Sequence, residues 1–190
     1  MPDESHPTRE VLLDAGVRLA ERKRLLDTSI DEIVREAGLA KGTFYVHFKD
    51  RTALLVAMHR RFYEKLNAEI AAAVAGLPAG PERLRRGALA YLDGCLNAQA
   101  VKALLLEARV LDEIAAEVAT RTTQSAALAS RDFRAMRQPN PKQCGRLFVT
   151  MVAETALAEL DRHAADAKLR AALWTLGGIG AARKTARSTS

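Results

Sequence analysis

The chain has 190 residues, of which 48% are hydrophobic and 5% aromatic, and its formal net charge is +6. This length allows a small domain followed by a larger one, and no apolar run approaches the roughly 18 residues that a membrane-spanning helix needs. The net charge does not by itself indicate a nucleic-acid partner, because half of the excess lies in residues 183–190. We expect these residues to form a disordered basic tail.

Proline and glycine gather at four places, namely Pro7, 76–81, 139–141 and 177–180. The long segments between these breaks carry no strand pattern, so the expected fold class is all-α. Cys95 and Cys144 lie too far apart in sequence for a metal-binding pair, and we expect both to be small buried hydrophobic side chains. The sequence predicts neither a metal site nor a cofactor.

The first helix is expected at Thr8–Arg22, directly after Pro7. The second begins after Ser29, whose hydroxyl can accept from the Glu32 N–H while the Glu32 carboxylate accepts from the Ser29 N–H, a capping box. Gly38 follows where a helix end favours positive φ. The buried face of this helix has the three-and-four spacing of an amphipathic segment: Ile30, Ile33, Val34 and Ala37.

A third, short helix follows the turn at Gly38. Phe44 and Phe48 are four residues apart, so they share one face, which we expect to turn inward. Gly42 and Val46 then point furthest outward. A glycine inside a helix costs about 1 kcal/mol relative to alanine, and close approach of the backbone to another surface would compensate for that cost. Polar or basic residues flank this outward face: Lys41, Thr43, Tyr45, His47, Lys49 and Arg51.

Two short helices around a tight turn, with polar groups on the exposed side of the second, form a probe for the DNA major groove, whose width admits one α-helix. Val46 can contact a thymine methyl group, while Thr43 and Tyr45 can donate to base edges or phosphates. The cations between residues 41 and 61 face a single acidic residue, Asp50: Lys41, Lys49, Arg51, Arg60 and Arg61. The alternative interpretation is a small packed turn with solvated surface charges.

A longer pattern includes this segment. Its elements are Asp14-Ala15, Thr28-Ser29-Ile30, Ile33, Ala37-Gly38, Lys41-Gly42-Thr43-Phe44-Tyr45, His47-Phe48 and Leu54-Leu55. From Thr8 to about Phe62 the chain thereby resembles the DNA-binding domain of the TetR family of bacterial transcriptional regulators. The resemblance implies operator phosphate contacts for Thr28, Lys41, Thr43, Tyr45, His47 and Lys49. It also implies that Gly42, Thr43 and Val46 lie against base edges.

The sequence departs from the family pattern at two positions. Family members usually carry an aromatic residue where Ala20 stands and a glycine near Lys23. The cations of the connection 22–24 could add a phosphate contact or could simply be solvated loop charges.

The fourth helix is expected at Thr52–Ala75, with Asp50 as its cap. Further helices are expected at Glu82–Asn97, Ala98–Ala108, Leu111–Met136, Lys142–Ala164 and Asp166–Leu176. We assign residues 1–51 to the helix-turn-helix DNA-binding domain, 52–182 to a helical effector-binding and dimerisation domain, and 183–190 to the disordered tail.

The segment Cys144–Leu160 is apolar on nearly every side, so it needs two partners. One is its own core, and we infer that the other is the same helix of a second copy, since dimers of the family pair through their last two long helices. The alternative is complete burial within one subunit. The expected interface residues are Leu147, Met151, Leu157, Leu160, Leu169, Leu173 and Leu176. A dimer would read a palindromic operator in double-stranded DNA.

The function that follows is that of a TetR-type transcriptional regulator, by resemblance a repressor, released from DNA by a small-molecule effector that the sequence does not identify. Candidate pocket residues, each of which could instead be core, are Leu92, Cys95, Leu96, Leu104, Leu105, Phe133, Phe148 and Met151. We expect a cytoplasmic protein associated with the nucleoid, without a membrane partner. The alternative function is a helical interaction protein with a vestigial DNA-reading head.

An enzyme is not expected. Glu159 and His163 lie four apart on a helix and could share a metal, but a third ligand is missing, so an exposed ion pair is the preferred interpretation. The glycines at 177–180 lack the preceding strand of a phosphate-binding loop and indicate the end of a helix.

Overall fold

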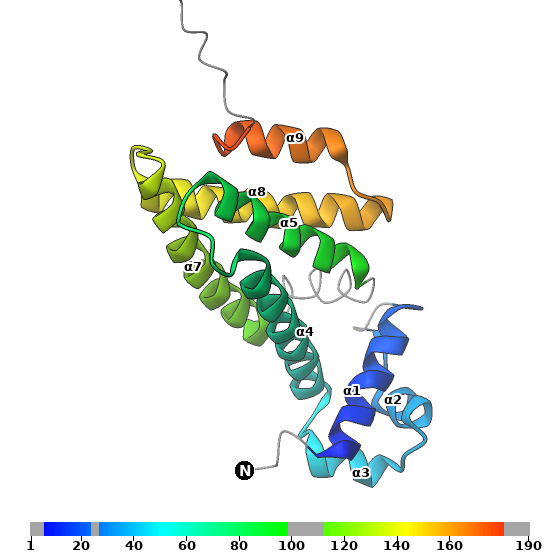
Figure 1. The fold of residues 1–190 in the computed structure, drawn as a ribbon. Helices are drawn as coiled ribbons and strands as arrows, with labels where there is room; N and C mark the ends of the chain where they lie inside the picture. The colour runs from blue at the N-terminus through cyan, green and yellow to red at the C-terminus, as the bar shows by residue number, and fades with distance from the viewer. Residues whose placement is uncertain (1–5, 24–26, 99–111, 181–190) are drawn as a thin grey trace, which may run out of the picture. The chain divides into compact units, whose positions relative to one another are not determined.

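The computed structural model describes residues 6–23, 27–98 and 112–180, and every regular element within these ranges is an α-helix (Figure 1). The elements are α1 (Pro7–Ala20), α2 (Ile30–Ala37), α3 (Lys41–His47), α4 (Arg51–Val74), α5 (Pro81–Asn97), α7 (Asp112–Ala135), α8 (Pro141–Arg162) and α9 (Ala167–Leu176). The predicted all-α fold class is confirmed. Among the described helices, none is long and apolar enough to cross a membrane.

Predicted and observed helix ends differ by roughly one or two residues, the usual uncertainty at helix ends. Asp50 caps α4 as predicted, because its Oδ1 accepts from the Ala53 N–H at 2.8 Å. The predicted helix Ala98–Ala108 and the tail 183–190 fall almost entirely outside the described residues.

The chain forms two compact units. The first contains α1, α2, α3 and α4 as far as Glu69, with the end of α5 from Gly94 and the start of α7 as far as Arg121. The second contains the remaining parts of α4, α5 and α7 together with α8 and α9. These units do not coincide with the predicted boundary after residue 51, because the first turns of α4 contribute buried side chains to the same core as α1, α2 and α3: Leu54, Leu55 and Met58.

The core of the first unit is closely packed where α1 meets α4. A methyl group placed on Gly16 would lie 2.5 Å from the Met58 sulfur, so α1 and α4 approach closely here and a larger residue would displace the Met58 side chain. Leu12 and Leu13 of α1 are fully buried beside this contact. Tight packing between α1 and α4 fixes the relative position of these two helices, and α2 and α3 pack into the same core.

A buried histidine lies on the next turn of α4. His59 is fully buried, and neither Nδ1 nor Nε2 has a hydrogen-bond partner. Its ring packs against Tyr63 with a centroid distance of 4.6 Å, and the Arg121 guanidinium lies 5.1 Å from the centroid of the same tyrosine ring. Burial, with a further contribution from Arg121, lowers the pKa of His59 to about 4. The ring is therefore neutral at neutral pH.

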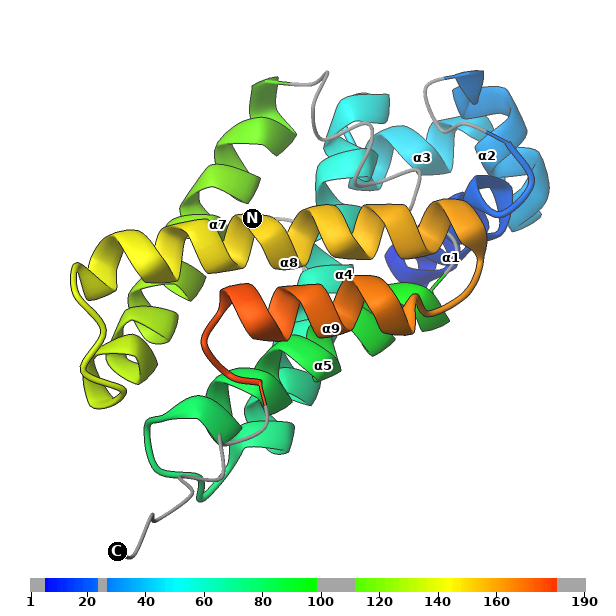
Figure 2. The same ribbon diagram turned by 90° about the horizontal axis from the view of Figure 1, so that it is seen from above.

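In the second unit, α8 and α9 lie side by side (Figures 1 and 2) and are joined by a buried carboxylate. Glu159 accepts from Arg170 Nε at 2.6 Å and Nη2 at 2.8 Å, and from the Asp166 N–H at 2.9 Å. Arg170 Nη1 also donates to Asp93 Oδ1 of α5 at 2.7 Å. These hydrogen bonds raise the pKa of Arg170 above its ordinary value.

The expectation of an exposed Glu159–His163 pair is wrong. Glu159 is fully buried and bound to Arg170, whereas His163 is exposed and ends α8 with a φ of 52°. The carboxylate therefore serves the α8–α9 connection and is not available to a metal. The expectation for the cysteines is half right, because Cys95 is buried but Cys144 is only partly covered, with its thiol donating to the Pro139 carbonyl at 3.3 Å.

His59 generates a test of stability. The unfolded histidine titrates near pH 6.5, while the native one titrates near 4, so between these values the unfolded state binds more protons and stability falls as the pH falls. We expect His59→Leu to raise the free energy of unfolding by about 1–3 kcal/mol, because an unsatisfied buried group is removed, and its advantage to grow from pH 6.5 to pH 4. Urea unfolding of both proteins across this range measures the difference; an advantage independent of pH would contradict the assignment.

Candidate nucleic-acid interface

The turn between α2 and α3 is fixed by hydrogen bonds at both ends of α2. The predicted capping box is present: the Glu32 N–H donates to Ser29 Oγ at 3.2 Å, and the Ser29 N–H donates to Glu32 Oε2 at 2.8 Å. Lys23 Nζ donates to Glu32 Oε1 at 2.6 Å and is the largest cause that lowers the pKa of Glu32 to about 2. Gly38 ends the helix with a φ of 68°, as predicted.

The orientation of α3 agrees with the prediction. Phe44 and Phe48 are buried, with ring centroids 5.6 Å apart, in the same core as Ile33. On the opposite side, Val46 is 71% exposed and Tyr45 52% exposed. A methyl group placed on Gly42 would meet no atom within 4 Å. The helix therefore presents a shallow surface with an aromatic side chain and an aliphatic one beside bare backbone.

Polar groups surround this surface. Lys41 and Lys49 are exposed, and Thr43 is half-buried. His47 is also half-buried, and its ring lies 4.9 Å from that of His6, which precedes α1. Burial, followed by the charges of His6 and Arg9, lowers the pKa of His47.

Thr28 does not lie on this surface. Its side chain is only 1% exposed, whereas its carbonyl accepts from Arg51 Nη1 at 3.1 Å. The expected phosphate contact from the Thr28 side chain has no support from this geometry. Instead, Thr28 and Arg51 connect the segment before α2 with the start of α4.

Several predicted cations are engaged elsewhere. Arg60 pairs with Glu117 of α7 at 2.9 Å, and Arg61 pairs with Glu10 and Asp14 of α1, each at 2.8 Å. The basic cluster inferred for residues 41–61 is therefore reduced near α3 to Lys41, Lys49 and Arg51. The local sequence held no sign of this, because the acidic partners lie on other helices.

The cations of the segment after α1 are also paired with carboxylates of another helix. Arg22 pairs with Glu36 at 3.3 Å, and Lys23 pairs with Glu32. An additional phosphate contact from these two cations is therefore not favoured. Lys23 also keeps an ordinary negative φ, so the family's usual glycine is not required here.

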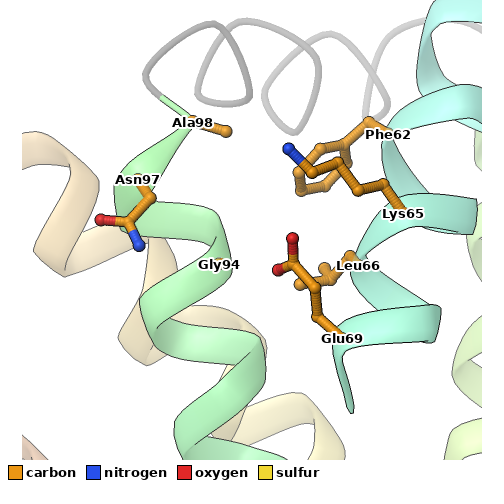
Figure 3. Close-up of a pocket in the computed structure, with 7 residues that line it drawn as sticks. All are labelled: Phe62, Lys65, Leu66, Glu69, Gly94, Asn97 and Ala98. Atoms are coloured by element: carbon orange, nitrogen blue, oxygen red, sulfur yellow. The ribbon is translucent and has the colours of Figure 1, made fainter. Parts of the chain in front are cut away.

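A cleft lies in the first unit between α4 and the end of α5 (Figure 3). Its volume is about 220 Å³. Its lining residues are Phe62, Lys65, Leu66 and Glu69 from α4, with Gly94, Asn97 and Ala98 from the end of α5 and just after it. In Figure 3 the Lys65 and Glu69 side chains and the Ala98 methyl group project into the space between the two helices.

None of the predicted effector-pocket residues that the structure describes lines this cleft. Leu92 and Cys95 are fully buried, and Phe133 and Phe148 pack against each other with ring centroids 5.7 Å apart. These four are core residues. Leu96 and Met151 are half-buried, and Leu104 and Leu105 lie outside the described residues.

The predicted dimer residues divide into two groups. Leu147 and Leu176 are strongly exposed, at 64% and 72%, while Met151, Leu157 and Leu169 are half-buried. Leu160 and Leu173 are buried within the single chain, so their assignment to an interface is wrong. A helix that is apolar on nearly every side does not reveal from sequence which side its own core covers.

Comparison with known proteins agrees with the geometry of α2 and α3. Residues 12–58 match the family model described as bacterial regulatory proteins, tetR family. This segment belongs to the TetR family. The TetR-family match begins within α1 at Leu12, covers the whole of α2 and α3, and ends in the first turns of α4 at Met58.

Curated relatives carry the TetR-type segment over part of their length. The transcriptional regulator EthR of Mycolicibacterium smegmatis is 31% identical over 77 residues, which cover 40% of this chain and 36% of EthR. The transcriptional repressor NemR of Escherichia coli is 32% identical over 92 residues, covering 48% of this chain and 45% of NemR. The matches thus span less than half the length of these relatives.

Solved TetR-type structures share the fold over nearly the whole chain. A TetR-like transcriptional regulator from Rhodococcus sp. RHA1 has a TM-score of 0.75 at 17% identity, covering 94% of this chain and 95% of its own. Reduced E. coli NemR has a TM-score of 0.69 at 21% identity, covering 92% and 97% of the two chains. At these identities the likeness establishes the fold alone.

The open surroundings of Gly42 generate a test of α3. Gly42→Ala should raise the free energy of unfolding by about 0.5–1 kcal/mol, because the added methyl group meets no atom and alanine has the higher helix propensity. Gly38→Ala is the matched control: its surroundings are equally open, but its φ of 68° should make the same substitution cost about 1–2 kcal/mol. Urea unfolding measures both, and a loss of stability in Gly42→Ala would refute the observed exposure of α3.

Proposed function

We propose that this protein is a DNA-binding transcriptional regulator of the TetR type, acting as a repressor that binds a palindromic operator as a homodimer and is released by a small molecule. The observation that carries the proposal is the orientation of α3. Its two phenyl rings lie in the core, so Gly42, Tyr45 and Val46 are left outward at the tip of the unit. An α-helix with this exposed surface fits the major groove.

The proposed contacts follow from the position of each side chain. Gly42, Thr43 and Val46 lie against base edges, where the bare backbone at Gly42 permits close approach. Phosphates on either side are contacted by Lys41, Tyr45, His47, Lys49 and Arg51. The match of residues 12–58 to the TetR-family model and the relatives named as transcriptional regulators support this assignment.

Dimerisation is proposed on chemical grounds. One short helix reads only a few base pairs, and each good base contact contributes about 1–3 kcal/mol of discrimination, so two heads related by a two-fold axis are needed for a specific site. The exposed Leu147 of α8 and Leu176 of α9 support an interface on these helices. Half-buried Met151, Leu157 and Leu169 complete the proposed surface.

Effector control is proposed to act through the cleft between α4 and the end of α5. Phe62 and Leu66 give it an apolar wall, and Lys65 and Glu69 add charged groups at its edge. Because α4 also contributes Leu54, Leu55 and Met58 to the core beneath α3, a ligand that favours one position of α4 would change the DNA affinity in proportion to its preference. We place such a regulator in the cytoplasm, on the nucleoid, and assign it no catalytic role.

The DNA contact is tested with fragments selected from random duplex DNA. Tyr45→Ala should weaken binding to the selected fragment by about tenfold or more per head, because a hydrogen bond to a charged phosphate contributes about 1.5–3 kcal/mol. Leu128→Ala is the control, since Leu128 is similarly exposed but lies on α7 in the second unit. Gel-shift titrations measure both affinities. Unchanged binding in Tyr45→Ala, or a wild-type affinity that is flat with salt, would favour a protein partner instead.

The cleft is tested with a chemical library screened for release of a fluorescent operator fragment. Ala98→Phe should fill the cleft, so that hits active on the wild type no longer release DNA while affinity for DNA alone is unchanged. Ala68→Phe is the matched control, because Ala68 is an exposed residue of α4 outside the lining. Equal release from both variants would exclude this cleft as the effector site.

A further inference from the structure

The lysines on either side of the outward face of α3 already have carboxylate partners. Lys41 Nζ lies 2.9 Å from Asp31 Oδ1 and donates to Asp31 Oδ2 at 3.1 Å. Lys49 Nζ lies 3.8 Å from Asp50 Oδ2. The side chains of Lys41, Asp31 and Lys49 are more than half exposed, and that of Asp50 is 49% exposed. Both lysines belong to the proposed phosphate contacts. Carboxylates thus already pair with the two ammonium groups that would contact phosphates.

We propose that Asp31 is an intramolecular counter-ion of Lys41 that operator phosphate must displace, so that it weakens phosphate binding and makes DNA affinity less dependent on salt. The inference rests on the proposed DNA-binding function. Asp31, a residue outside α3, would thereby help to set the affinity of the protein for DNA.

Of the two acidic residues, Asp31 fits this part better than Asp50. Asp50 has a structural task, because its Oδ1 caps α4, and its distance to Lys49 is long for an ion pair. Asp31 holds Lys41 with both oxygens, and this hydrogen bond is the largest cause that raises the pKa of the lysine. Among the described residues, Lys41 is the one side chain that binds Asp31. Its position in the first turn of α2 also favours a negative charge.

The expected effect follows from the ions exchanged on binding. A lysine that reaches a phosphate releases about 0.9 of a condensed cation from B-DNA, which is the source of the salt dependence. When Lys41 turns to a phosphate, the exposed Asp31 carboxylate loses its ammonium partner and attracts a cation from solution. Part of the release is thereby offset.

The consequence concerns the balance between affinity and specificity. Phosphate contacts carry no sequence information, so Asp31 lowers affinity for operator and for random DNA by the same factor. The base contacts of Gly42, Thr43 and Val46 are unaffected. The ratio of operator affinity to random-DNA affinity, which sets specificity, is therefore unchanged while both affinities are lower.

The experiment compares full-length wild type with Asp31→Asn, which keeps the shape of the side chain and removes its charge. Fluorescence anisotropy with random duplex and with the selected fragment, over a series of KCl concentrations, gives affinity and salt slope. We expect Asp31→Asn to bind both DNAs more tightly, by about threefold at low salt, with a log–log slope steeper by up to about 0.9 per bound head. Circular dichroism melting verifies that the variant is folded.

Two control proteins separate this account from a general charge effect. Glu64→Gln changes the net charge by the same amount at an exposed residue of α4 and should have little effect. In a Lys41→Gln background, Asp31→Asn should lose its steeper slope. An unchanged affinity in Asp31→Asn, or an equal gain in Glu64→Gln, overturns the inference while the proposed function stands. Failure of the wild type to bind any duplex would overturn both.

Discussion

Burial of the Phe44 and Phe48 rings is the interaction on which the rest of the N-terminal unit depends. Two aromatic side chains four residues apart can be covered only if one face of α3 turns toward α1, α2 and α4. The opposite face is then necessarily free, and its composition decides what the helix can contact. Gly42, Tyr45 and Val46 occupy that face because the hydrophobic core has already taken the alternative.

Charge neutralisation within the unit is the second constraint. Arg61 binds carboxylates of α1, Arg60 binds one of α7, and Lys23 binds one of α2. These pairs hold the helices together at their edges and leave few cations for a polyanion. A regulator built this way would gain its affinity from a small number of positioned contacts, with bulk positive charge contributing little.

The sequence predicted the features that depend on neighbours within one or two helical turns. The capping box at Ser29, the left-handed Gly38 and the Asp50 cap are local hydrogen bonds, and the inward turn of Phe44 and Phe48 follows from helical spacing. Partners that are distant along the chain were not predictable. Arg60 and Glu117 are 57 residues apart, and nothing in the periodicity of either helix indicates that they meet.

The errors have the same physical origin. Thr28 is buried because the chain before α2 folds back toward Arg51, a tertiary contact without a local signal. Leu160 of α8 and Leu173 of α9 were assigned to an interface because the sequence does not show which apolar side chains of these helices the chain's own core covers. The cleft beside α4 was missed since Lys65 and Glu69 look like ordinary exposed helix charges.

The Glu32 carboxylate has a consequence for acid unfolding. It accepts at once from the Ser29 N–H, the Ser29 hydroxyl and the Lys23 ammonium. A proton on this group would weaken the carboxylate half of the capping box and the ion pair with Lys23 together, while the Ser29 hydroxyl would still accept from the Glu32 N–H. Strong acid should therefore loosen the start of α2 and its connection to the segment after α1 at the same pH.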